Sequence, residues 1–165
     1  MKYKNLFSPN KLKYVLGKER PAVDCILCSI VSRDPKVKLL EIKRSDNFVV
    51  AANLYPFNAG HLLIFPMRHV EDISGLTGEE ALEMHNLLNE VLTVLRQEYN
   101  PGGFNIGFNI GRCSGASIPH IHMHIVPRYE RELGFADIVG GAKLIVENPS
   151  TTMKKLKKAF KLKKG

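Results

Sequence analysis

Three histidines alternate with apolar residues in the run IPHIHMHIVP, residues 118–127. On a β-strand, residues two apart point to the same face, so we expect His120, His122 and His124 to form one row with neighbours about 6.5–7 Å apart. The intervening apolar side chains then point to the opposite face, where they can pack in the core. Packing alone rarely requires three imidazoles in strict alternation, so we interpret the row as an element that carries chemistry.

Two kinds of chemistry fit such a row. An imidazole has an ordinary pKa of about 6.5, so it can act as nucleophile, base or acid near neutral pH. It is also a common metal ligand, so the three histidines could instead hold one catalytic metal. The residues before the row favour phosphate, because Gly115, Ala116 and Ser117 form a small-residue turn whose N–H groups and hydroxyl can contact phosphate oxygens. Asn109 joins them if the two flanking strands pair.

The pattern of apolar residues predicts the elements that position this row. Thr77 and Glu80 form a capping-box pattern at the start of a long helix, whose apolar residues recur at spacings of three and four up to Asn100. Residues 104–110 alternate strictly, and a second alternating strand is expected to begin at Ile118. Earlier strands are expected at residues 38–44, 48–54 and 61–65. This order predicts an α+β fold with a mainly antiparallel sheet.

The run GFNIGRCSGASIPHIHMHIVPR strongly resembles the histidine-triad (HIT) superfamily, and the similarity extends upstream through NLYPFNAGHLLIFPMRHVEDI to cover about residues 25–128. The segment IVGGAKLIVE is similar to the C-terminal part of the branch that acts on diadenosine polyphosphates. The resemblance implies a HIT-like fold with a sheet of about five strands, one long helix and a short N-terminal helix. The expected organisation is an N-terminal arm over residues 1–24, a HIT domain over 25–150 and a basic C-terminal tail over 151–165.

The resemblance also implies a role for each matching residue. His122 is the expected nucleophile, which forms a nucleotidyl-histidine intermediate and so splits one displacement into two. His124 is expected to bind the phosphate and assist the leaving group. Ser117 and Asn109 match positions that contact the α-phosphate, and Asn53 matches one that hydrogen-bonds the ribose. No catalytic metal is required in the family mechanism, although magnesium bound to the substrate can assist.

The expected reaction is cleavage of the α-phosphate linkage of adenosine nucleotides such as diadenosine polyphosphates. Many members of the superfamily have Gln where this chain has Ala116, and that Gln helps to hold the phosphates. Phosphorolysis, in which phosphate replaces water as acceptor, is therefore the alternative to hydrolysis. The histidine row also fits a metal-dependent phosphoesterase that uses it as a ligand set, or an enzyme that removes adenylyl groups from nucleic-acid ends.

A second site is suggested by the C-x-x-C pair of Cys25 and Cys28, which is typical of half a metal site or a redox motif. The alternative is a pair of buried free thiols. Cys113 makes the count odd, which argues against a disulfide framework. By resemblance, His69 and His120 match the positions that complete a Cys2His2 zinc site. Such a closed site would hold structural zinc and tie the N-terminal arm to the strand of histidines.

Length and composition fit a single domain, since the chain has 165 residues of which 44% are hydrophobic. The net charge of +8 is largely local, because residues 153–165 carry seven lysines and no acidic residue, and we expect this tail to be solvated and frayed. No apolar run reaches the roughly 18 residues of a membrane span, and no signal-peptide core is found. We therefore expect a cytoplasmic protein without membrane contact, a homodimer as is common in the superfamily, with nucleic acid not an expected partner.

Overall fold

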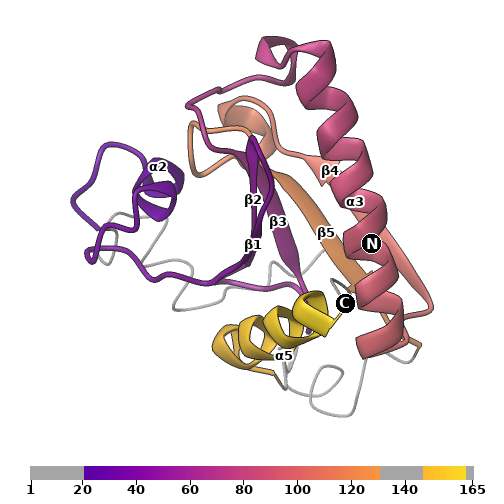
Figure 1. Ribbon diagram of the computed structural model, residues 1–165. Coiled ribbons are helices and arrows are strands. Elements are labelled where there is room, and N and C mark those ends of the chain that lie inside the picture. The colour runs from indigo at the N-terminus through magenta and orange to yellow at the C-terminus, as the bar shows by residue number, and fades with distance from the viewer. Residues whose placement is uncertain (1–20, 131–146, 163–165) are drawn as a thin grey trace, which may run out of the picture.

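The structure, a computed structural model, describes residues 21–130 and 147–162. A five-stranded antiparallel sheet lies at its centre, in the order β1-β2-β3-β5-β4 (Figure 1). The strands are β1 (Glu41–Arg44), β2 (Phe48–Ala52), β3 (Leu62–Pro66), β4 (Gly103–Phe108) and β5 (Met123–Arg128). The described helices are α2 (Ile26–Val31), α3 (Gly78–Tyr99) and α5 (Pro149–Leu162), with 3-10 turns at Ile73–Gly75 and Arg112–Ser114. The predicted α+β fold, with one long helix and a short helix near the N-terminus, is confirmed.

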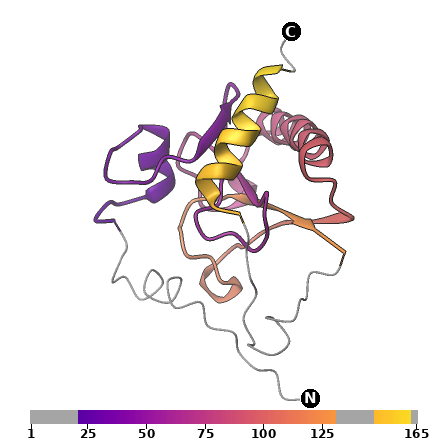
Figure 2. The same cartoon turned by 90° about the horizontal axis from the view of Figure 1, so that it is seen from below.

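The central strands pack against helices on both faces of the sheet. Along β2, Phe48 and Val50 belong to the core formed with α3 and α5, whereas Val49 and Ala51 belong to the core formed with α2. Figures 1 and 2 show α3 and α5 on one face of the sheet and α2 on the other. Because β2 and β3 are buried at every position, their sequences are continuous apolar runs.

The start of α3 is fixed by the predicted capping box. The Glu80 N–H donates to Thr77 Oγ1 (3.2 Å), and the Thr77 N–H donates to Glu80 Oε2 (2.8 Å). Arg68, just after β3, donates to the same carboxylate and to the carbonyl of Gly75, which fastens the connection between β3 and α3. The hydrogen bond from Arg68, followed by that from Thr77, lowers the pKa of Glu80 to about 2.

No helix in the described ranges is long and apolar enough to cross a membrane.

One predicted strand begins later than expected. β5 starts at Met123, not at Ile118, and β1 and β4 are also shorter than their predicted ranges. Pro119 has no N–H for a ladder, and the Ile121 N–H donates to the carbonyl of Val70 (2.6 Å) instead of to a neighbouring strand. Residues 118–122 therefore lie outside β5, but His120 stays on the face of the sheet that α2 covers, where its ring meets Phe65 edge-on at a centroid distance of 6.1 Å.

The expectation of a frayed basic tail over residues 153–165 is wrong up to residue 162, because Pro149–Leu162 form the helix α5. Thr152, Leu156 and Phe160 recur every four residues and are buried, so the helix has one face that packs against the sheet and α3. Lysines occupy most positions between these three residues, so the segment reads as a basic run and not as an amphipathic helix. Most of the expected N-terminal arm and the segment IVGGAKLIVE, apart from its last residue, lie outside the described residues.

Replacing Leu156 by alanine should destabilise the protein, because this side chain is fully buried between α5 and the sheet. We expect a loss of about 2–5 kcal/mol in the free energy of unfolding, measured by urea denaturation. The matched control is Leu162→Ala at the exposed end of the same helix, where 73% of the side chain is accessible and the expected change is within about 0.5 kcal/mol. Equal effects of the two substitutions would contradict the docked position of α5.

Candidate active site

A pocket of about 350 Å³ lies between α2 and the face of the sheet that α2 covers. His122 and His124 line this pocket, which has the size and mixed polarity of a small-molecule site. The predicted substrate-binding residues line the same pocket: Asn53, Asn109, Gly115 and Ser117. Much of the remaining wall is apolar: Ile26, Leu27, Ile30, Val37, Leu40, Leu54, Leu63, Phe65 and Ile118. The fold thus brings together every predicted catalytic and substrate-binding residue except His120.

His122 is oriented by the backbone two residues before it. Its Nδ1 lies 2.7 Å from the carbonyl oxygen of His120, and because a carbonyl only accepts, Nδ1 must carry the proton. The lone pair of the neutral ring is therefore on Nε2. Burial of the side chain lowers the pKa of His122 below its ordinary value of 6.5, although the hydrogen bond to His120 acts in the opposite direction. His122 is thus held as a neutral imidazole with one defined nucleophilic nitrogen.

The tautomer of His124 is set by a second chain of hydrogen bonds. The Phe57 N–H donates to His61 Nδ1 (3.0 Å), so the proton of neutral His61 is on Nε2. That nitrogen lies 3.0 Å from His124 Nδ1, which must accept, and this leaves the proton of neutral His124 on its own Nε2. The ring centroids of His122 and His124 are 4.9 Å apart. A nucleophilic nitrogen and an N–H donor therefore sit side by side on neighbouring rings.

His61 is a site residue that the sequence motifs do not reveal. β3 pairs with β5 so that Leu63 lies opposite His124, and His61, two residues before Leu63, shares this face. The ring of Phe57 stacks on His61 at a centroid distance of 5.1 Å. The parity of His61 with Leu63 is available from the sequence, but the pairing of β3 with β5 is not.

The polar residues around the histidines are positioned by turns. Asn53 follows β2, where its Oδ1 accepts from the Tyr55 N–H (3.2 Å) and its own N–H donates to the carbonyl of His61 (3.0 Å). Ser117 belongs to the loop between β4 and β5. In this loop Gly115 has a φ of +87°, a left-handed conformation that favours glycine. The loop geometry therefore explains why a glycine precedes the expected phosphate contacts.

A second cluster brings together Cys25, Cys28, His69 and His120, whose ligand atoms all lie within 4.8 Å of one another. His120 Nδ1 is 3.4 Å from Cys25 Sγ and 3.5 Å from Cys28 Sγ, and His69 Nδ1 is 3.4 Å from Cys28 Sγ. A tetrahedral zinc bound at about 2.3 Å from sulfur and about 2.0–2.1 Å from nitrogen would place S and N ligands about 3.5 Å apart. These spacings fit a zinc ion.

The protonation of the cluster also fits a metal. His120 Nε2 donates to the carbonyl of Pro66 (2.9 Å), so its lone pair is on Nδ1, toward the thiols. Burial, the main cause, lowers the pKa of His120 to about 4, which keeps the ring neutral at pH 7. Burial and the neighbouring Cys25 raise the pKa of Cys28 to about 11, so a thiolate pair is stable here only with a cation beside it. His69 Nε2 lies 3.5 Å from a carboxylate oxygen of Glu71.

This arrangement corrects the hypothesis of one metal held by His120, His122 and His124. The imidazole of His120 points to the cysteines, away from the pocket that His122 and His124 line. Within residues 21–130 and 147–162, the one group with the spacing of a metal site is the Cys2His2 cluster. The histidine row therefore divides between two sites.

Comparison with known proteins agrees with this geometry. The family model for the HIT domain matches residues 35–131, more than half of the chain. The chain belongs to the HIT domain family. A relative from Mycobacterium tuberculosis named AP-4-A phosphorylase is 32% identical over 149 residues, which are 85% of this chain and 75% of the relative. "Protein hit" from Bacillus subtilis is 34% identical over 119 residues, 71% of this chain and 79% of that one.

Among solved HIT structures, a Zn-bound histidine triad family protein from Mycobacterium smegmatis aligns with a TM-score of 0.70 and 25% identity. The alignment covers 86% of this chain and 96% of that chain. The family match, together with relatives named AP-4-A phosphorylase and asymmetrical bis(5'-nucleosyl)-tetraphosphatase, confirms the expectation of a HIT-type nucleotide hydrolase or transferase.

Proposed function

We propose that this HIT protein cleaves the phosphoanhydride at the α-phosphorus of adenosine nucleotides such as diadenosine polyphosphates, through a nucleotidyl intermediate on His122. The observation that carries the proposal is the pair of fixed tautomers, which presents an unprotonated Nε2 on His122 beside a protonated Nε2 on His124. The apolar wall of the pocket suits a nucleobase, and Asn53 suits the ribose.

In the first step, His122 Nε2 forms a bond to the α-phosphorus while the bond from phosphorus to the leaving phosphate oxygen breaks. The Nε2–H of His124 donates a hydrogen bond to that oxygen, which leaves as a phosphate anion with the electron pair of the broken bond. The ring of His122 then carries a positive charge, which the carbonyl of His120 stabilises through the Nδ1–H bond. In the second step the acceptor attacks phosphorus and the bond to His122 Nε2 breaks, which returns the ring of His122 to its neutral form. A water acceptor releases one proton to the solvent, whereas an inorganic phosphate dianion attacks through an oxygen that carries no proton.

The acceptor is the point on which two candidate reactions differ. Water as acceptor makes the protein a hydrolase, and inorganic phosphate makes it a phosphorylase. Two observations favour phosphate: Ala116 lies in the loop without an amide side chain, and the relative that matches over 149 residues is named AP-4-A phosphorylase. We therefore keep phosphorolysis beside hydrolysis as a candidate for the same site.

Incubation with diadenosine tetraphosphate, with and without inorganic phosphate, should give nucleotide products that chromatography can identify. AMP plus ATP indicates hydrolysis, and phosphate-dependent ADP plus ATP indicates phosphorolysis. His122→Asn should lower turnover by about 10³-fold or more, because it removes the nucleophile. His85→Asn, on the exposed face of α3, is the matched control and should retain activity. Turnover that survives in His122→Asn would exclude the proposed intermediate.

The pH profile of kcat/KM should reflect the lowered pKa of His122. Protonation of His122 blocks attack, so activity is lost as the pH falls through the pKa of this group, which lies below 6.5. We therefore expect most of the activity to remain at pH 6.5 on the acidic side of the profile, with the decline at lower pH. An acidic midpoint at 6.5 or higher in steady-state kinetics would contradict the neutral, buried state of His122.

We also propose that the Cys2His2 cluster holds a structural zinc ion. Zinc would neutralise two thiolates there and join α2 to the turn before β5, because Cys25 and Cys28 flank the start of α2 while His120 lies in that turn. The supporting observations are the ligand spacing and the orientation of His120 Nδ1.

Homodimer formation stays a prediction. The exposed side chain of Ile106 on the edge strand β4 supports it.

Metal analysis of the purified protein should find one zinc per chain. Cys28→Ala should lose that zinc and lower the melting temperature, because structural zinc contributes directly to folding. Cys113→Ala removes an exposed cysteine and should change neither zinc content nor melting temperature. Zinc retained at one per chain by Cys28→Ala would show that the ion sits elsewhere.

A further inference from the structure

α5 presents a face that consists of lysines. The helix Pro149–Leu162 contains five lysines and no acidic residue. Its apolar face is buried against the sheet and α3, whereas Lys154, Lys157, Lys158 and Lys161 are exposed. Because the apolar side fixes the rotation of the helix, these four ammonium groups are held on one side of the molecule.

The charges on this face are not neutralised by ion pairs with described residues. Lys155 is half-buried: its Nζ donates to the carbonyl of Glu98 (2.6 Å) and lies 3.9 Å from Glu98 Oε2 and 3.9 Å from the centre of the Tyr99 ring. For the four exposed lysines, no acidic group in residues 21–130 or 147–162 lies within 4.0 Å. The face therefore keeps its positive potential.

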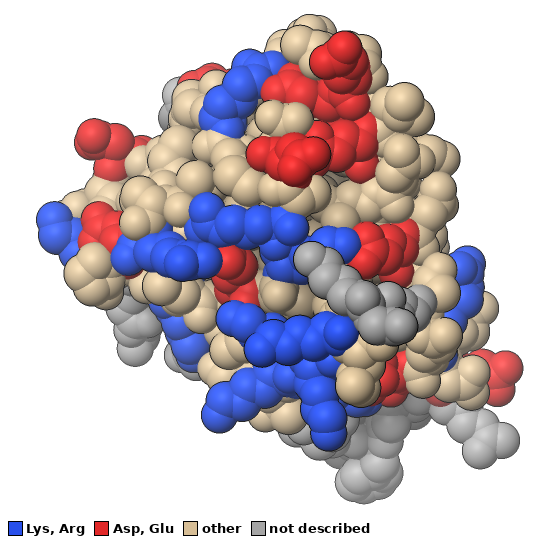
Figure 3. All heavy atoms as spheres, viewed as in Figure 1, with Lys and Arg blue, Asp and Glu red and all other residues tan. Residues whose placement is uncertain are grey.

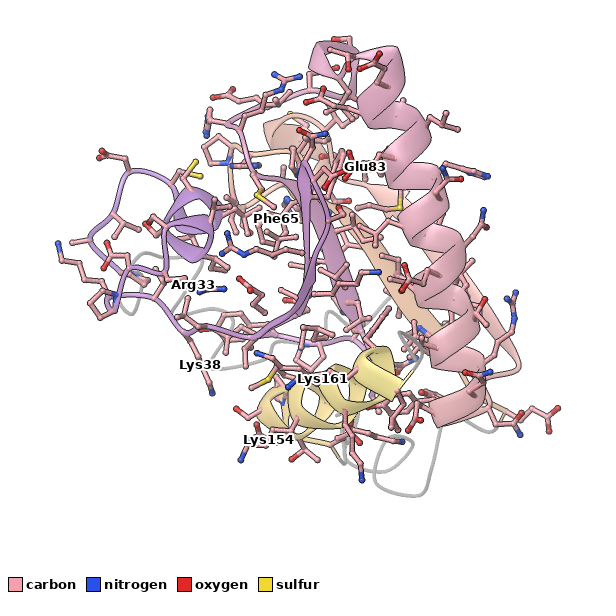
Figure 4. The ribbon with its side chains drawn as sticks, in the orientation of Figure 1. Arg33, Lys38, Phe65, Glu83, Lys154 and Lys161 are labelled. Atoms are coloured by element: carbon pink, nitrogen blue, oxygen red, sulfur yellow. The ribbon has the colours of Figure 1, made fainter. Side chains whose placement is uncertain are left out.

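The lysines of α5 belong to a wider basic surface. Figure 3 shows Lys and Arg gathered over α5 and over the segment that leads into β1, and Figure 4 places Lys38 and Arg33 on that segment. Lys38 is exposed, while Arg33 pairs with Glu41 at 3.1 Å. Acidic residues gather at the other end of the same face, around the start of α3 (Figure 3). A polyanion would thus be attracted to the α5 end.

We propose that the exposed lysines of α5 bind the phosphate backbone of a nucleic-acid strand. Lysines three or four residues apart on a helix rise by about 4.5–6 Å, so the row can meet successive phosphates of one strand. Lysine binds phosphate as a point charge, without the fixed fork that arginine uses for bases. Binding is therefore independent of base sequence, and it does not rest on the catalytic function proposed above.

The structure favours a nucleic acid over a lipid surface. A helix that lies in a membrane interface embeds an apolar face, and the apolar face of α5 is already buried in the core. Leu162, at the end of the helix, is the single large apolar side chain that α5 exposes. The sequence alone does not favour a nucleic-acid partner, because the body of the chain has no interleaved aromatic and basic residues. The folded helix adds a fixed basic face, which the sequence pattern does not predict.

The experiment measures the fluorescence anisotropy of a labelled single-stranded thymidine 20-mer with the full chain between 50 and 200 mM NaCl. The wild-type protein is expected to bind, and log Kd should rise linearly with log salt concentration. The triple variant Lys154→Gln, Lys158→Gln, Lys161→Gln should lower the slope of that line by about 2 and weaken binding at 50 mM NaCl about tenfold or more. Its melting temperature should not change, since the three side chains are exposed.

The control variant makes the same change in net charge elsewhere. Asn86→Asp, Asn89→Asp, Gln97→Glu on α3 also lowers the charge by three. Its salt slope should stay near the wild-type value. Equal loss in both triple variants would show that only overall charge matters and would overturn the proposal. Absence of wild-type binding at 50 mM NaCl, or binding to phosphatidylglycerol vesicles without binding to the oligonucleotide, would also overturn it.

Discussion

The two sites depend on the position of one residue, His120. Its side chain donates from Nε2 to the carbonyl of Pro66 and directs Nδ1 to the two cysteines, while its own carbonyl accepts from Nδ1 of His122. A shift of this residue would disturb the cysteine cluster and the tautomer of the nucleophile together. His120 and His122 are two positions apart but have different surroundings. The side chain of His120 contacts Cys25 and Cys28, whereas that of His122 faces the pocket.

The two faces of the sheet have different roles: one packs in the larger apolar core, and the other forms a wall of the pocket. The face covered by α3 and α5 contains the larger apolar core, including Phe48, Leu95 and Leu156. Of the helices in residues 21–130 and 147–162, the short α2 lies on the opposite face, and the pocket lies beside it. Alternation along the strands allows neighbouring residues to serve opposite faces. This explains why the histidines of the pocket can be buried yet reachable by a ligand.

Much of this structure follows from local sequence patterns, and the errors have physical causes. The capping box of α3 and the strands around the histidines depend on short spacings, so they are predictable. β5 begins later than expected because Pro119 has no N–H for a ladder, yet His120 keeps the face that alternation predicts and contacts Phe65 there. α5 is not evident in the sequence because lysines fill most positions between Thr152, Leu156 and Phe160, so the repeat of buried residues every four positions is hard to recognise. The part played by His61 depends on the pairing of β3 with β5, which is a contact between distant segments.

Backbone groups assign the proton positions of the histidine rings in the pocket. The carbonyl of His120 fixes the proton of His122, and the Phe57 N–H begins the chain that fixes those of His61 and His124. A backbone group has no pKa in the accessible range, so the backbone partners of His122 and His61 keep the same donor or acceptor role as the pH changes, which a carboxylate partner would not. The roles of the ring nitrogens at the site are therefore a property of the fold: the turn before β5 and the loop before β3 decide which nitrogen attacks and which donates.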